Sequence, residues 1–167
     1  LFDSSFGWRF VNPKMEAQYG AEGMGQTAEN LVDLHGISRE DQDAFACWSH
    51  EKATASKEWR QEEIVSVAIP RRKQEDLIFD DDEFIRPGTT REALSKLRPA
   101  FRKDGGSVTA GNSSGLNDGA CALLYASEAG MRSHGLQPLT EVLSTAVVGV
   151  DPSIMGIGPV KASVLAL

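Results

Sequence analysis

A helical period of hydrophobic residues is clearest between residues 38 and 59. Ser38 is followed three residues later by Asp41, an arrangement typical of the residue that caps a helix N-terminus. Apolar side chains then recur at positions that fall on or near one face of a helix. The pattern predicts an amphipathic helix that reaches residues 57–59, and the side chains of that face are Ala44, Phe45, Trp48, Ala55 and Trp59.

Shorter helices are indicated by capping residues at their starts and by glycines just past their ends. Thr27 is placed to cap a helix that runs to His35, with Gly36 beyond it. Gly135 is placed in the same way after a helix over 127–133. Two further short helices are predicted, one near Met15–Tyr19 and one from the Thr89–Thr90 pair to Lys96.

Strand patterns occupy three segments. Residues 63–69 are rich in β-branched side chains and are followed by a proline. Residues 120–126 predict a buried strand, and residues 139–149 carry a second long apolar strand pattern. Because the helix over 127–133 lies between these two, their order predicts a layered α/β core. The composition changes near Gly106, where we place a domain boundary.

Charge and composition exclude several classes of function. The formal net charge is −7 and the pI is about 5.0, which argues against nucleic-acid binding. No apolar run approaches the ~18 residues of a membrane-spanning helix, so no membrane partner is expected. Cys47 and Cys121 form neither a disulfide framework nor a zinc motif, and both are expected to pack. We therefore expect a reducing, cytoplasmic compartment and no metal site.

The glycine-containing segment 111–119 is the best functional candidate from the residues alone. Its small side chains would let a ligand approach the backbone closely. It lacks the lysine of a phosphate-binding P-loop and the spacing of a dinucleotide fingerprint, so a tight structural turn explains it equally well. His35, His50 and His134 have no nearby acid and nucleophile in sequence, which favours solvated or packing roles for them.

Several longer motifs follow one another over nearly the whole chain. They are MGQTAEN at 24–30, ISREDQDAFA at 37–46, LRPAF at 97–101, VTAGNSSGLNDGA at 108–120, GVDP at 149–152 and MGIGP at 155–159. In this order they resemble the thiolase family. The resemblance implies two similar βαβ-type halves stacked in α/β/α/β/α layers, with an inserted α+β loop domain that covers the active site and holds coenzyme A.

The resemblance also assigns the parts of the chain to that fold. Residues 1–106 would form the loop domain, and residues 107–167 the end of the N-terminal half and the start of the C-terminal half. A complete family member is more than twice this length. The chain starts at Leu1 with no initiator methionine and no signal sequence, so both of its ends are expected to be cuts.

Thiolases cleave a 3-oxoacyl-CoA with coenzyme A to acetyl-CoA and a shortened acyl-CoA, or run the reverse condensation. In the family a nucleophilic cysteine activated by a histidine takes the acyl group, and a second cysteine acts as acid and base. These groups are expected outside this chain, because neither Cys47 nor Cys121 lies in a matching motif.

The resemblance therefore implies an acyltransferase as the full-length protein and an inactive isolated chain. Acyl-CoA and coenzyme A would be its substrates, with no permanently bound cofactor, and a homodimer or homotetramer would be the assembly. The alternative is a non-catalytic coenzyme A-binding or assembly module of the same fold.

Five residues match family positions that contact coenzyme A. Ala110 and Ser114 resemble the contacts to the pantetheine arm, and Leu97 and Phe101 resemble the apolar contacts around the ligand. Arg86 resembles the arginine beside the adenine nucleotide, where a guanidinium can stack on the base or pair with phosphate. Core packing explains Leu97 and Phe101 equally well.

Two methionines and the opening segment are relevant to recognition of the acyl group. Met24 and Met155 match methionines that line the acyl pocket, although core packing explains Met155 equally well. Biosynthetic acetoacetyl-CoA thiolases have a histidine where this chain has Gly23. Residues 7–13 instead resemble the degradative 3-oxoadipyl-CoA branch of the family. In that branch Arg9 could pair with the distal carboxylate of the acyl chain, or serve as a surface residue.

Overall fold

The computed structural model describes residues 10–167, which divide into two compact units. One unit is Met24–Gly115, and the other is formed by residues 10–23 together with 116–167. Arg9, for which pairing with the acyl carboxylate and a surface role were both left open, lies outside the described residues. No helix in residues 10–167 has the length and apolar character needed to cross a membrane.

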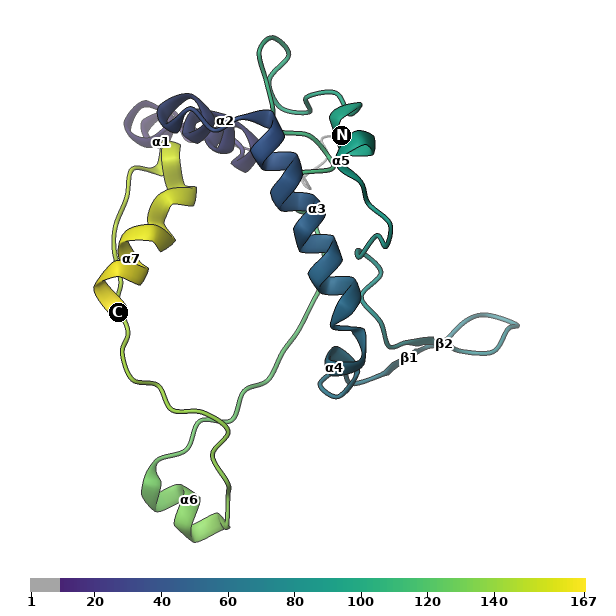
Figure 1. Ribbon diagram of the computed structural model, residues 1–167. Coiled ribbons are helices and arrows are strands. Elements are labelled where there is room, and N and C mark those ends of the chain that lie inside the picture. The colour runs from purple at the N-terminus through teal and green to yellow at the C-terminus, as the bar shows by residue number, and fades with distance from the viewer. Residues whose placement is uncertain (1–9) are drawn as a thin grey trace. The chain divides into compact units, whose positions relative to one another are not determined.

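The Met24–Gly115 unit begins with two helices, α2 (Met24–His35) and α3 (Arg39–Ala55) (Figure 1). Helix α2 starts three residues before Thr27, so the prediction that Thr27 caps it is wrong. The Thr27 hydroxyl lies inside the helix and donates to the Met24 carbonyl at 2.9 Å. Gly36 follows the helix, as predicted. Its φ of 63° lies in the left-handed region, which glycine adopts without strain because it has no Cβ.

Helix α3 has the predicted cap but not the predicted length. Ser38 Oγ accepts the Asp41 amide at 3.0 Å, which satisfies one of the free amides of the first turn. The helix then ends at Ala55, and a separate helix, α4 (Lys57–Gln61), follows Ser56. The Ser56 hydroxyl donates to the Ala53 carbonyl and accepts from Arg60, so it competes with the backbone at the break.

The apolar face predicted for α3 does not form the core of this unit. Phe45 and Trp48 are exposed and contact each other edge to face, and Trp59 on α4 is also exposed. The buried side chains of α3 are Asp43 and Cys47. Hydrogen-bond partners elsewhere in the unit decide this outcome, because a buried polar group is tolerated only where it is paired.

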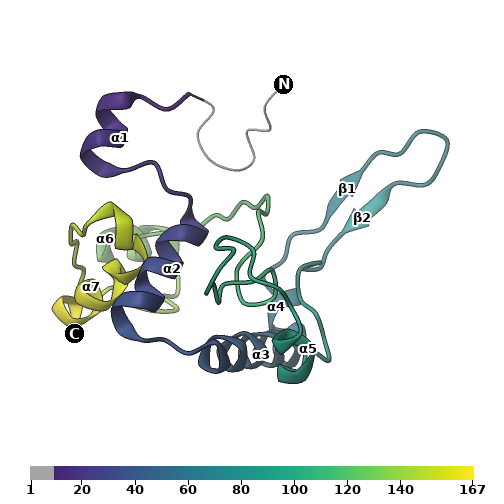
Figure 2. The ribbon, with the colours of Figure 1, turned by 90° about the horizontal axis from the view of Figure 1, so that it is seen from above.

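A hairpin and a short helix complete the regular elements of this unit. Strand β1 (Val67–Ile69) pairs antiparallel with β2 (Leu77–Phe79), with Ala68 opposite Ile78. Only the last three residues of the predicted strand 63–69 are therefore extended and paired. Both strands are exposed, and Figures 1 and 2 show the hairpin projecting beyond α3 and α5. Helix α5 (Arg91–Ser95) starts at the predicted cap, where Thr90 Oγ1 accepts the Ala93 amide at 3.2 Å.

The second unit contains α1 (Pro13–Tyr19), α6 (Glu128–His134), the 3-10 helix η1 (Pro152–Ile157) and α7 (Gly158–Ala166). The predictions for α1 and α6 are confirmed. Ser127 caps α6 by accepting the Gly130 amide, and Gly135 follows it with φ of 64°. Both features follow from local chemistry alone.

The strands predicted at 120–126 and 139–149 are not formed. Both segments are irregular, and most of their apolar side chains are exposed, including Leu124, Leu143 and Val147. A strand is stable only when its backbone pairs with a neighbour. Within residues 10–167 the only sheet is the two-stranded β1–β2 hairpin, so these segments have no partner there. The strand–helix–strand core is correspondingly not formed by the described residues.

Candidate functional site

A fully buried carboxylate fixes the chain just before the glycine-containing segment. Glu29 lies on α2, and its Oε1 accepts the Ser107 amide at 2.9 Å and the Val108 amide at 2.8 Å. Its Oε2 accepts the Ser107 hydroxyl at 3.2 Å, and Gln42 on α3 donates to that hydroxyl. These bonds satisfy the carboxylate and tie residues 107–108 to two helices.

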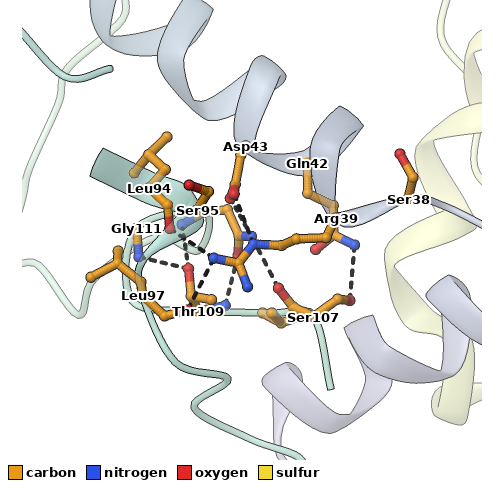
Figure 3. A network of polar contacts seen from close by, with 12 residues as sticks. Ser38, Arg39, Gln42, Asp43, Leu94, Ser95, Leu97, Ser107, Thr109 and Gly111 are labelled. Atoms are coloured by element: carbon orange, nitrogen blue, oxygen red, sulfur yellow. Dashed lines mark hydrogen bonds and ion pairs between the residues drawn. The ribbon is translucent and has the colours of Figure 1, made fainter. Parts of the chain in front are cut away.

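An arginine on α3 holds the chain after α5. Arg39 Nε donates to Asp43 Oδ2 at 2.8 Å, one turn further along the same helix. Its Nη2 donates to the carbonyls of Leu94 at 2.7 Å and Leu97 at 3.1 Å (Figure 3). The Leu94 carbonyl lies in the last turn of α5 and the Leu97 carbonyl just beyond the helix, at the end where a cation is well placed.

Asp43 continues this network to the glycine-containing segment. Its Oδ1 accepts Asn112 Nδ2 at 3.0 Å, and Asn112 Oδ1 accepts the Thr109 amide at 2.7 Å. The fully buried Thr109 hydroxyl accepts the amides of Gly111 and Asn112, and Ser113 Oγ donates to the Thr109 carbonyl at 2.6 Å. Residues 109–113 therefore form a turn fixed by hydrogen bonds between side chains and the backbone.

The residues matched to the pantetheine arm lie on this turn and beside it. Ala110 and Ser114 are exposed, so their surfaces are available to a ligand. Leu97 is 40% exposed and packs against the turn at Gly111. A Cβ at Gly111 would lie 2.6 Å from Leu94 Cδ2 and closer still to Leu97 Cδ1. Glycine is therefore required for this close approach.

Phe101 packs against the start of α2. Its ring lies over Gly25, so closely that a Cβ on residue 25 would overlap the ring. Phe101 is 44% exposed, and Met24, adjacent to Gly25, is 64% exposed. The structure thus brings Phe101 to the residue next to Met24, and both present apolar surface to solvent.

Arg86 belongs to the same unit as this cluster, whereas Met155 belongs to the second unit. Arg86 is exposed in the same unit, and its amide donates to His50 Nδ1 at 3.3 Å, while its carbonyl accepts the Thr89 hydroxyl. Its guanidinium is therefore presented from the segment that precedes α5. Met155 lies in η1 of the second unit and is 49% exposed.

Comparison with known proteins identifies the family. Residues 9–129 match the family model described as "Thiolase, N-terminal domain". The chain belongs to the thiolase family. It also matches the crystal structure of the Bacillus anthracis acetyl-CoA acetyltransferase with a TM-score of 0.82 and 42% identity, covering 100% of this chain and 44% of that one. The thiolase-like fold is thereby confirmed.

The curated relatives carry names from two branches of the thiolase family. A beta-ketoadipyl-CoA thiolase of Pseudomonas putida is 50% identical over 97% of this chain and 40% of its own length. An acetyl-CoA acetyltransferase of Pseudomonas aeruginosa is 56% identical over 86% of this chain and 37% of its own length. The chain thus spans about two fifths of the length of the curated relatives it matches.

The sequence analysis missed the thiolase residues that hold the turn. Glu29, Arg39 and Asp43 lie within the quoted motifs but were not candidate site residues, and Asn112 lies in the candidate segment 111–119 without having been assigned a role. One signal was available, since Arg39 and Asp43 stand four apart on a helix, where opposite charges meet. The partners of Glu29 lie far along the chain and give no local signal.

Cys47 is buried in this thiolase unit and poorly suited to act as a nucleophile. Its thiol donates to the Thr89 carbonyl at 3.2 Å and lies 3.6 Å from Glu51 Oε1. Burial raises the pKa of the Cys47 thiol, and the neighbouring Glu51 carboxylate raises it further. Cys47, Ala44, Trp48, Glu51 and Arg91 line a surface pocket of about 270 Å³. The expectation that Cys47 packs is confirmed, whereas the same expectation for Cys121 is wrong, because Cys121 is exposed.

Proposed function

We propose that the full-length protein catalyses thiolase-type acyl transfer, cleaving a 3-oxoacyl-CoA with coenzyme A or running the reverse condensation. This chain would supply residues that bind coenzyme A. The observation that carries the proposal is the turn at 109–113, which a buried polar network fixes beside Leu97 while Ala110 and Ser114 stay exposed. A preformed surface of this kind costs little ordering when a ligand binds.

Different residues are proposed to contact different parts of coenzyme A. Ala110 and Ser114 would contact the pantetheine arm, Leu97 and Phe101 would pack on it, and Arg86 would bind the adenine nucleotide. Apolar surface next to a few fixed polar groups is typical of small-molecule sites. Met24 and Met155 would line the acyl pocket. The layered α/β/α/β/α core, with residues 1–106 as its loop domain, remains part of the proposal.

Calorimetric titration of the 167-residue chain with coenzyme A tests the binding assignment. We expect saturable binding that Arg86→Ala and Ser114→Ala each weaken by about three- to thirtyfold, the loss expected for one charged or polar contact. Glu62→Gln, an exposed change away from these residues, is the control. A folded sample that shows no saturable heat would contradict the assignment.

Substrate preference is proposed from Gly23 and from the relatives' names. We infer a 3-oxoadipyl-type acyl chain, because Gly23 replaces the histidine of biosynthetic members and beta-ketoadipyl-CoA thiolases are among the relatives. The full-length enzyme should then have a higher kcat/KM for 3-oxoadipyl-CoA than for acetoacetyl-CoA. The reverse order would instead favour acetoacetyl-CoA as the substrate. The similarity to the Pseudomonas aeruginosa acetyl-CoA acetyltransferase supports that alternative.

A non-catalytic coenzyme A-binding or assembly module is the second candidate. The observation that favours it is that neither cysteine of the chain lies in a catalytic motif, and Cys47 is buried. Thiolysis by the full-length protein but not by the 167-residue chain would reject this candidate. Turnover by the chain itself would contradict the assignment of catalysis to residues outside it.

The assembly and location follow the family as proposals. We propose a cytoplasmic homodimer or homotetramer for the full-length protein, with no nucleic-acid partner given the net charge of −7. Light scattering coupled to gel filtration would measure the assembly, and a monomeric mass would contradict it. Cell fractionation would test the location.

A further inference from the structure

A hydrogen-bond path through side chains joins the two segments that we assign to the pantetheine arm, in addition to the direct backbone bond from the Ala100 amide to the Val108 carbonyl at 2.9 Å. It starts at the Leu97 carbonyl, passes through Arg39 and Asp43 on α3, and continues through Asn112 to the Thr109 amide. Leu97 lies at one end of the path and the turn that carries Ala110 and Ser114 lies at the other. Figure 3 shows Leu94, Leu97 and Gly111 side by side, with Arg39 and Asp43 next to them.

The Arg39–Asp43 pair is more than a surface ion pair. The Asp43 side chain is 4% exposed and the Arg39 side chain is 21% exposed. Each oxygen of Asp43 has its own donor, Arg39 Nε for Oδ2 and Asn112 Nδ2 for Oδ1. Arg39 in turn donates to two backbone carbonyls, and a rigid guanidinium fixes the direction of such bonds.

We propose that Arg39 and Asp43 are positioning residues for coenzyme A binding, an inference that rests on the proposed function. They hold Leu97 and the turn at 109–113 at one spacing that fits the pantetheine arm, and they do so without being assigned any contact to it. Arg86, assigned to the nucleotide end, is held by His50 and Thr89 and lies outside this path. The pair therefore sets the affinity for the pantetheine end of the ligand and not for the nucleotide end.

Two substitutions break the path with little change in shape. In Asp43→Asn the amide keeps one acceptor oxygen, so its NH2 group faces either Arg39 or Asn112, both of which are donors. In Arg39→Lys a single ammonium replaces the fork that now reaches Asp43 and two carbonyls. Glu92→Gln is the matched control, because it removes the exposed Lys96–Glu92 pair, which has the same four-residue spacing on a helix.

The test measures binding of three probes to the 167-residue chain, namely coenzyme A, 4′-phosphopantetheine and adenosine 3′,5′-bisphosphate. Both variants should weaken coenzyme A and phosphopantetheine by about tenfold, in the range of couplings carried through packed networks, and leave the bisphosphate within about twofold. Glu92→Gln should change none of the three. Circular dichroism checks folding first, and Arg39→Lys carries the prediction alone if Asp43→Asn unfolds.

Each result decides the inference. Equal weakening of all three probes would mean a general structural role for the pair, and unchanged binding would mean no role, so either overturns it. Both of those results leave coenzyme A binding by the unsubstituted chain, and with it the proposed function, intact. Absence of coenzyme A binding by the unsubstituted chain would overturn the proposed function and this inference together.

Discussion

The carboxylate of Glu29 accepts the backbone amide of Ser107, 78 residues further along the chain, at a distance of 2.9 Å. Glu29 is fully buried, and its other acceptor contacts are with the Val108 amide and the Ser107 hydroxyl. A buried carboxylate in this position is stable because these three donor groups satisfy its oxygens. A residue on α2, far away in the sequence, thus fixes the chain just before the turn at 109–113.

Replacing Glu29 with glutamine should destabilise the chain by about 2–3 kcal/mol. Glutamine keeps the shape but turns an NH2 group toward backbone donors, so at least one buried donor loses its partner. Urea unfolding followed by circular dichroism measures the change. Glu62→Gln, at an exposed position, should stay within about 0.5 kcal/mol. Equal stability of the two variants would contradict the role assigned to Glu29.

Replacing Thr109 with valine should cost about 1–3 kcal/mol and loosen the turn. Valine has nearly the same shape but leaves the Gly111 and Asn112 amides without their hydroxyl acceptor. Hydrogen exchange at those two amides should become faster. Thr109→Ser keeps the acceptor, so exchange there should remain close to that of the unsubstituted chain. Similar exchange in both variants would show that the hydroxyl does not fix the turn.

Replacing Gly25 with alanine should displace the Phe101 ring. The new Cβ would overlap ring atoms, and relief requires the ring to move as a whole, an overpacking cost of about 1–3 kcal/mol. Thermal unfolding and aromatic NMR shifts of Phe101 measure the effect. Gly23→Ala is the control, since a Cβ there meets no heavy atom within 4 Å. An unshifted Phe101 spectrum would contradict the observed contact.

Asp81 should titrate below the ordinary range for an aspartate. The hydrogen bond from Lys57 lowers the pKa of Asp81, and the Asp82 amide lowers it further. The lowered pKa means that the contact stabilises the fold above the unfolded-state pKa of about 3.9, and that this stabilisation is lost as the pH falls through the folded-state value. NMR titration of the Asp81 carboxyl carbon should show the lowered pKa, and Lys57→Ala should move it back up.

The two cysteines should differ in their reactivity toward thiol reagents. Cys121 is exposed, whereas Cys47 is buried and its thiol pKa is raised by burial and by Glu51. Because the thiolate is the reactive form, iodoacetamide near pH 8 should label Cys121 first. Peptide mass spectrometry over time measures both rates, and denaturant should abolish the difference. Faster labelling of Cys47 in the folded chain would contradict its placement.

Local chemistry predicted the helix ends well. Ser38 and Thr90 each cap a helix as expected, because the acceptor oxygen and the free amide lie within three residues of each other. Ser127 caps α6 in the same way, although only the helix and not its cap was predicted. Thr27 did not, because its hydroxyl can also bond back to a carbonyl inside a helix. Residues 152–166, which form η1 and α7, were not predicted as helical.

The candidate site likewise contains residues that the sequence motifs pointed to and residues that only the fold revealed. The motifs placed Ala110, Ser114, Leu97, Phe101, Arg86, Met24 and Met155 as candidates, and their assigned contacts remain proposals. The residues that hold the turn, Glu29, Arg39, Asp43 and Asn112, became visible only in the fold. Apart from the Arg39–Asp43 pair and the local bonds of Asn112, their partners are 55 to 79 residues away, a separation over which no periodic pattern carries information.

The sequence by itself determined the family, the helix caps and the turn glycines, because these depend on motifs or on neighbours within a few residues. Tertiary structure decided which side chains are buried. Asp43 and Cys47 are buried on α3 while Phe45 and Trp48 are exposed, because distant partners satisfy Asp43 and Cys47. It also decided that 120–126 and 139–149 are irregular, since a strand requires a neighbour and an apolar pattern alone does not provide one.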